Sequence, residues 1–258
     1  MSEQNIQPLF RLRVEYVKAG RLAYLGHLEV LHTIERIIRR ASLPYAVTQG
    51  FSPHMRAGFS SALPVGTSSR SEWYDVFLTS LVPPAEALQR LQAASPEDLM
   101  ATRCGYVDVR TPALTAQITR VLYRIELSFT DASAGCPDVS DALSEVIGLG
   151  RIPYARGKKN KVLDVDRMLV SHRVADGEGC IVLELDTRCD NEGALRPEIL
   201  VAAIDRVLAR RAVASDDDPI QSTGIQRFDR IARYRVERRA QLVEGEDGEL
   251  IDPLCARS

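Results

Sequence analysis

The fold of the N-terminal half is decided by the stretch RLRVEYVKAGRLAYLGHLEVLHTIERIIRRASLP, residues 11–44. From Arg11 to Val17 charged and apolar side chains alternate, which predicts a strand with one face in water. Residues 26–44 then predict an amphipathic helix that ends at Pro44. On a helical wheel its apolar face comprises Val30, Leu31, Ile34, Ile37, Ile38 and Ala41. A strand followed by such a helix is the start of an α+β unit.

The remaining pattern extends this start into two similar halves. The first half adds strands at residues 45–50, 72–80 and 104–110 and a helix at 83–94. The second half predicts, in order, a strand at 119–130, a helix at 138–148, two strands within 162–187, a helix at 196–211 and a strand at 224–237. We therefore expect an α+β protein made of two tandem ferredoxin-like (βαββαβ) halves with antiparallel sheets. Their expected bounds are 1–113 and 114–240, and residues 241–258 are expected to form an acidic, flexible tail.

Composition and charge restrict the class of protein. The 258 residues carry a formal net charge of -2, so the chain is not a uniformly basic nucleic-acid binder, although a local basic face is compatible with that charge. Neither a signal peptide nor a membrane-spanning run is apparent, and we expect a cytoplasmic protein. The five cysteines are widely spaced, which argues against a disulfide framework. The close-spaced cysteine triplet of an iron–sulfur cluster is missing.

Two histidines are candidates for general acid–base catalysis. His27 opens the first helix, where its imidazole either packs at the sheet edge or reaches a site at the end of the sheet. His54 lies in the segment GFSPHMRAGFSSALPVGTSSRSEWYDV, residues 50–76. Its glycines and Pro53 favour an ordered loop that presents His54 to a ligand, and an inert connection is the alternative. We expect no metal site, because His32 follows His27 at a spacing that places the two about 140° apart around the helix.

Two basic clusters are candidates for binding RNA or another anion. Arg36, Arg39 and Arg40 share the polar face of the first helix, and guanidinium groups fit phosphate well. The run ARGKKNK, residues 155–161, is the most basic in the chain. A solvated surface is the alternative reading of both clusters. With the loop residues, the full set of candidates is Arg36, Arg39, Arg40, His54, Arg56, Lys158, Lys159 and Lys161.

Several short motifs stand out along the chain. Those of the first half are Gly26-His27-Leu28-Glu29, Arg39-Arg40-Ala41, Gly50 to His54, Leu63 to Gly66, and Glu72, and those of the second half are KKNKVLDVDRML and ALRPEIL. Together they resemble the radical SAM-linked family of bacterial proteins, over roughly residues 9–236. Gly26 and Glu29 depart from the family's usual serine and aspartate, which weakens the helix cap.

The resemblance implies a role but not a reaction. Members occur beside, or fused to, a radical SAM enzyme with a cobalamin-binding-like region. We therefore expect a non-catalytic accessory protein of such an enzyme that binds tRNA or rRNA or presents a substrate. The iron–sulfur cluster, S-adenosylmethionine and cobalamin would belong to the partner, and we expect no cofactor in this chain. Two alternatives remain: a metal-independent endoribonuclease similar to CRISPR-repeat-processing enzymes, and a protein–protein adaptor without affinity for nucleic acid.

Overall fold

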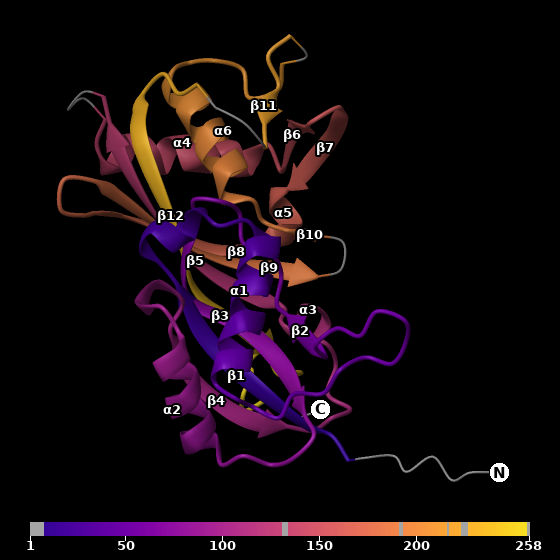
Figure 1. Cartoon of the computed structure of the whole chain (residues 1–258). Coiled ribbons are helices and arrows are strands. Elements are labelled where there is room, and N and C mark those ends of the chain that lie inside the picture. The colour runs from indigo at the N-terminus through magenta and orange to yellow at the C-terminus, as the bar shows by residue number, and fades with distance from the viewer. Residues whose placement is uncertain (1–7, 131–133, 191–192, 216, 223–226, 257–258) are drawn as a thin grey trace. The chain divides into compact units, whose positions relative to one another are not determined.

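The chain is an α+β protein with a large mixed sheet and a small three-stranded sheet (Figure 1). The computed structural model describes residues 8–130, 134–190, 193–215, 217–222 and 227–256. The chain divides into two compact units: residues 1–119 with 238–258 form unit 1, and residues 120–237 form unit 2. No helix in these described ranges combines the length and the apolar character needed to cross a membrane. The predicted α+β class is confirmed.

Unit 1 is built on antiparallel strands in the order β2-β3-β1-β4. Strand β12 flanks β3, and β13 pairs with β12. The elements of unit 1 are β1 (Phe10–Lys18), η1 (Gly20–Tyr24), α1 (His27–Arg40), β2 (Ala57–Phe59), β3 (Ser68–Leu78), α2 (Pro84–Ala94), η2 (Glu97–Leu99), β4 (Ala101–Val107), α3 (Leu114–Gln117), the end of β12 (Ile231–Glu244) and β13 (Leu250–Ile251).

One face of the unit 1 sheet forms the apolar core with α1 and α2. Side chains alternate across a strand, so every second residue of β1 and β3 reaches this face. Residues Leu12, Val14, Tyr74, Val76 and Leu78 are buried there against the helices. The apolar face predicted for the first helix is confirmed for Val30, Ile34, Ile37, Ile38 and Ala41, whereas Leu31 is only half-buried.

The opposite face of the unit 1 sheet buries charge instead. The expectation that one face of the first strand lies in water was therefore wrong, because Arg11, Arg13 and Glu15 of β1 are all buried. Asp75 of β3 accepts hydrogen bonds from Arg13 at 2.8 and 3.0 Å and from Arg11 at 2.6 and 3.0 Å. All three side chains are almost fully buried. A buried carboxylate shared by two guanidinium groups is stable only when its charge is compensated and its lone pairs are occupied, and both conditions are met here.

The same arginines fasten two distant segments of the chain to the sheet. Arg11 donates to the carbonyls of Thr111 and Pro112, and Arg13 donates to Gln117 at 2.7 Å and to the carbonyl of Pro253 at 2.8 Å. The segment 111–117 contains the expected boundary between the two halves, between residues 113 and 114. The segment around Pro253 belongs to the expected flexible tail, and in the structure it packs within unit 1.

Unit 2 has strands in the order β10-β9-β5-β12, and β8 also pairs with β9. Helices α4 and α6 lie side by side (Figure 1). Asp205 of α6 is buried and accepts backbone N–H bonds from Asp229, Arg230 and Ile231, at 2.8 to 2.9 Å, which fixes the start of β12. The elements of unit 2 are β5 (Arg120–Phe129), α4 (Cys136–Gly148), β6 (Arg151–Arg156), β7 (Lys159–Asp164), α5 (Val165–Met168), β8 (Leu169–Asp176), β9 (Ile181–Asp190), β10 (Gly193–Ala194), α6 (Pro197–Leu208), β11 (Ile220–Gln221) and the start of β12.

The strand prediction was wrong in two places. Residues 45–50 were expected to be a strand, but only Tyr45 and Val47 form isolated bridges, and the short strand β2 follows later. Strand β6 was not predicted, and β7 begins at Lys159, three residues before the strand expected from Val162; together they form a hairpin around the basic run 155–161. The strand expected over 224–237 begins, within the described residues, at Ile231, and residues 224–226 lie outside them.

The Asp75 network leads to a stability prediction. We expect Asp75→Asn to lower the free energy of unfolding by about 3 kcal/mol or more, because two buried guanidinium groups lose their shared carboxylate. Urea denaturation followed by circular dichroism measures the change. Asp108→Asn is the control, since Asp108 pairs with Arg110 at the exposed surface and loss of this pair should barely move the midpoint. Equal midpoint shifts in the two variants would contradict the structural role of Asp75.

Candidate functional site

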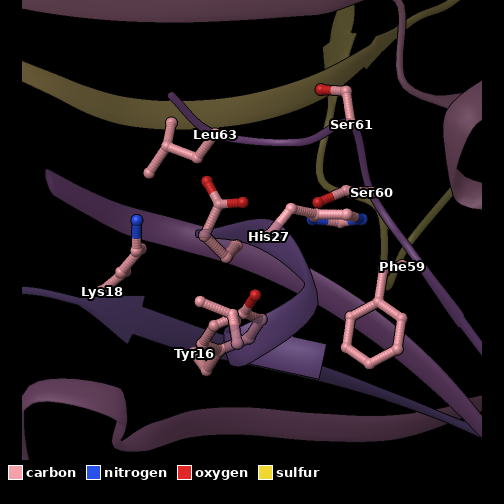
Figure 2. A pocket seen from close by; sticks show the side chains of 9 residues that line it. Tyr16, Lys18, His27, Phe59, Ser60, Ser61 and Leu63 are labelled. Atoms are coloured by element: carbon pink, nitrogen blue, oxygen red, sulfur yellow. The ribbon is translucent and has the colours of Figure 1, made fainter. Parts of the chain in front are cut away.

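The candidate site is a small polar pocket in unit 1, the Lys18 pocket, at the N-terminal end of α1 (Figure 2). Its walls come from the end of β1, the start of α1, the segment 59–63 and the middle of β3. The open space is about enough for one water molecule, so the pocket admits a small group rather than a whole substrate. The lining residues are Tyr16, Lys18, His27, Val30, Phe59, Ser60, Ser61, Leu63 and Glu72.

Lys18 is the cation of the pocket and is only 2% exposed. Its Nζ donates to the carbonyls of Ala23 and Leu25, at 2.8 and 3.0 Å. These carbonyls belong to the turn that leads into α1, so Lys18 helps to fix where the helix begins. Burial lowers the pKa of Lys18, and the nearby carboxylate of Glu72 opposes this effect. Two of the three ammonium donors are used, which leaves one for a ligand.

Glu72 is the anion of the pocket. Its carboxylate accepts two hydrogen bonds from Arg238 of β12, at 3.0 and 3.2 Å, and both side chains are buried. Arg238 also donates to the carbonyl of Ser61 at 3.1 Å. One guanidinium group thus positions both the carboxylate and the segment that closes the pocket.

Tyr16 lies directly opposite Glu72 in the register of β1 and β3. The side chain is 4% exposed, and its hydroxyl makes no hydrogen bond within the described part of the chain. Burial, and after it the charge of Glu72, raises the pKa of Tyr16 well above its ordinary value. The hydroxyl therefore stays protonated and can donate to a group that enters the pocket.

His27 stands at the mouth of the pocket as the first residue of α1. Its ring meets Phe59 edge to face, with centroids 6.5 Å apart. Burial lowers the pKa of His27, Glu72 raises it and Lys18 lowers it further. The neutral imidazole can accept a proton from a bound group at neutral pH. The first turn of α1 is capped by one of its own side chains, because the carboxylate of Glu29 accepts the backbone N–H of Gly26 at 2.7 Å.

His54 and Arg56 lie outside the Lys18 pocket. They belong to a finger, residues 45–56, in which backbone bonds join Thr48 to His54 and Ala46 to Arg56. Met55 is buried in the helix-side core, so its neighbours in sequence point the other way. Arg56 accordingly stacks on Phe77, 4.4 Å from the ring centroid. The two candidate histidines are thus not brought together.

The arginines of α1 form an exposed surface. Arg39 pairs with Glu35 at 3.4 Å, a weak exposed contact. Arg36 and Arg40 have no ion pair or hydrogen bond of their side chains in the described ranges. Both guanidinium groups are therefore available to phosphate.

The lysines of the second cluster lie in unit 2. Lys158, Lys159 and Lys161 surround the turn of the β6–β7 hairpin and are exposed. Gly157 opens this turn with φ +60°, a left-handed conformation that glycine adopts without strain. The hairpin presents its charge to solvent, which fits both the anion-binding reading and the solvated-surface reading of this run.

A signal that the sequence analysis missed lies between Arg36 and Ser71. This acid-free segment contains no aspartate or glutamate and five arginines, whereas the whole chain has 35 acidic against 33 basic residues. All five arginines are exposed in the structure. A scan of local charge would have found this segment. Tyr16 and Lys18 were also missed: the predicted strand ended at Val17, one residue before Lys18.

The described residues form neither a cluster of metal ligands nor a disulfide. Among the described residues, no three His, Cys, Asp or Glu side chains lie where they could hold a metal ion. All five cysteines are free. The chemistry available in the Lys18 pocket is therefore that of its own amine, imidazole, phenol and carboxylate.

A family model matches residues 11–197, which is more than half of the chain. The chain belongs to this family. The family is described as "Uncharacterized protein conserved in bacteria (DUF2344)". The matched region includes every lining residue of the Lys18 pocket and the whole acid-free segment. The family's description names no activity.

Other comparisons add no functional information. No curated protein matches the chain. Among solved structures, one described as an unknown protein from Galdieria sulphuraria is similar over 79% of this chain and 94% of its own, at 10% identity and a TM-score of 0.24.

The charges around His27 lead to a prediction for its titration. We expect Lys18→Met to raise the pKa of His27 and Glu72→Gln to lower it, because the first change removes a cation and the second an anion. NMR titration of the labelled imidazole measures both. In the unchanged protein, neutral His27 stabilises the fold above the ordinary imidazole pKa, and this contribution is lost as the pH falls. Shifts of the same sign in both variants would contradict the pocket geometry.

Proposed function

We propose that this chain is an RNA-binding accessory protein of a radical SAM enzyme. The observation that carries the proposal is the acid-free segment, residues 36–71, with its five exposed arginines. Because the chain as a whole has a net charge of -2, such a stretch concentrates positive charge in one region. Guanidinium groups bind phosphate oxygens with two donors each, and RNA carries one phosphate per nucleotide.

Two further observations support this proposal. The resemblance to radical SAM-linked proteins includes His27, Arg39 and Glu72, and DUF2344 membership covers the same residues. The strand orders β2-β3-β1-β4 and β8-β9-β5-β12 each fit the order of a ferredoxin-like unit. We propose on this basis that both units are ferredoxin-like, with the β6–β7 hairpin inserted in the second. The radical SAM chemistry and its cofactors belong, in this proposal, to the partner.

The proposal predicts salt-sensitive RNA binding that depends on α1. We expect the double variant Arg36→Gln/Arg40→Gln to bind tRNA or rRNA fragments more weakly. Each lost phosphate contact lowers the slope of log affinity against log salt by about 0.7, so the double variant should lose about 1.4. Filter binding over a range of salt concentrations measures this slope.

Arg90→Gln/Arg110→Gln is the matched control, because it removes the same charge from exposed arginines of unit 1 outside the acid-free segment. Binding should fall far less in this control. Wild-type protein that shows no salt-sensitive retention of RNA at micromolar concentration would overturn the proposal. Co-purification with a radical SAM enzyme in that case would favour the adaptor alternative.

A second candidate function is metal-independent cleavage of RNA. It is favoured by the neutral imidazole of His27 beside the amine of Lys18 and the hydroxyl of Tyr16. In this reaction His27 takes the proton of a ribose 2′-hydroxyl, whose oxygen attacks the adjacent phosphorus. The bond from phosphorus to the 5′-oxygen breaks, and the leaving 5′-oxygen takes a proton from water. Lys18 and Tyr16 would stabilise the charge that develops on the phosphate.

This second candidate is tested by incubating RNA with the protein in the presence of EDTA. Cleavage to a 2′,3′-cyclic phosphate that is abolished in His27→Ala but retained in His54→Ala would support it, because only His27 lines the Lys18 pocket. Intact RNA after prolonged incubation would exclude cleavage and leave the binding role as it stands.

A further inference from the structure

Hydrogen bonds and one buried side chain hold the base of the finger, residues 45–56, against unit 1. Its root is joined to β3 by the N–H of Ala46, which donates to the carbonyl of Phe77 at 2.7 Å. Higher up, Thr48 and His54 exchange two bonds: the N–H of Thr48 donates to the carbonyl of His54 at 2.8 Å, and the N–H of His54 donates to the Thr48 hydroxyl at 3.0 Å. Met55 is buried in the core and anchors the base. These contacts fix both chain ends of the tip, residues 49–53.

The tip carries a fully exposed aromatic ring. Phe51 is 112% exposed, more than any other large apolar side chain of the described residues. Gly50 precedes it with φ +133°, a conformation that other residues rarely adopt. The neighbouring ring of His54 is also exposed, and its Nε2 lies 3.3 Å from the hydroxyl of Ser52. Nothing in the finger covers the ring of Phe51.

The surroundings of Phe51 favour a nucleic acid over an apolar protein surface. The finger lies within the acid-free segment, so no carboxylate of its own repels a phosphate. Of the other exposed side chains of the finger, Thr48, Gln49, Ser52 and His54 are polar, and Val47 and Pro53 are apolar, so Phe51 is not part of a large continuous apolar patch. Proteins that bind single strands combine aromatic rings, on which unpaired bases stack, with cations along the backbone. Phe51 supplies such a ring, and Arg56 with the arginines of α1 supplies the cations.

We propose that Phe51 at the tip of the finger stacks on an unpaired base, and that the RNA bound by this chain is therefore single-stranded at this point. This inference rests on the proposed RNA-binding function and names the form of its substrate. A base inside a duplex is already stacked on both faces, so Phe51 cannot stack on it and adds no affinity for a duplex.

The test compares the binding of a single-stranded RNA of about 12 nucleotides with that of a duplex of the same sequence, by fluorescence anisotropy. We expect Phe51→Ala to weaken single-strand binding about fivefold or more and to leave the salt slope unchanged, because stacking involves no counterion release. Leu81→Ala is the matched control, since Leu81 is 61% exposed in unit 1 outside the acid-free segment. Its affinity should equal that of the wild type.

Phe51→Trp provides a direct readout of stacking. The chain has a single tryptophan, Trp73, which is fully buried, so the new indole would be the one that responds to a ligand. We expect single-stranded RNA to bind this variant as tightly as the wild type and to quench its fluorescence.

The outcomes separate this inference from the function on which it rests. Wild-type protein without salt-sensitive RNA binding overturns both. Wild-type protein that binds RNA while Phe51→Ala binds equally well, with no quenching in Phe51→Trp, overturns the role of the finger alone. Loss of a co-purifying protein in Phe51→Ala with unchanged RNA affinity also overturns it and assigns the ring to a protein contact.

Discussion

The structure of unit 1 depends on the carboxylate of Asp75, which is shared by the buried guanidinium groups of Arg11 and Arg13. Two buried cations can be retained only if this carboxylate stays between them, so β1 and β3 are held in one register. That register places Tyr16 opposite Glu72 on the helix-side face and thereby builds the Lys18 pocket. The same strand β3 carries Phe77, on which the finger is mounted. One ion-pair network thus positions both candidate functional features.

The two features have different chemistry and lie at different ends of α1. His27 begins the helix at the pocket, and Arg39 and Arg40 end it next to the finger. The 14 residues of α1 span about 20 Å. A single RNA strand that follows the helix would meet cations and an aromatic ring first and the pocket several nucleotides later. In the proposed role, the small pocket would hold or react with one group of that strand, and the exposed arginines would supply the affinity.

Sequence reasoning recovered the parts of the fold that have a clear period. The buried face of α1 from Val30 to Ala41 follows from the period of 3.6, and the position of β1 from the period of two. The charged face of β1 was expected in water, but it is buried, because Asp75 pairs there with Arg11 and Arg13. Sequence patterns also could not reveal strand β6 or the hydrogen bond from Arg13 to the carbonyl of Pro253, because contacts between distant residues leave no local pattern. For the site, His27 was found as the opening residue of a helix. Lys18 and Tyr16 were missed, because a burial that depends on Glu72 and Arg238 is visible only in three dimensions.

The proposed binding of RNA to the acid-free segment of unit 1 is tested most directly by ultraviolet cross-linking of a bound RNA followed by peptide mass spectrometry. We expect cross-links within residues 36–71, above all at Phe51 and His54, whose rings are exposed. Cross-links confined to unit 2, for example to the lysines of the β6–β7 hairpin, would contradict it.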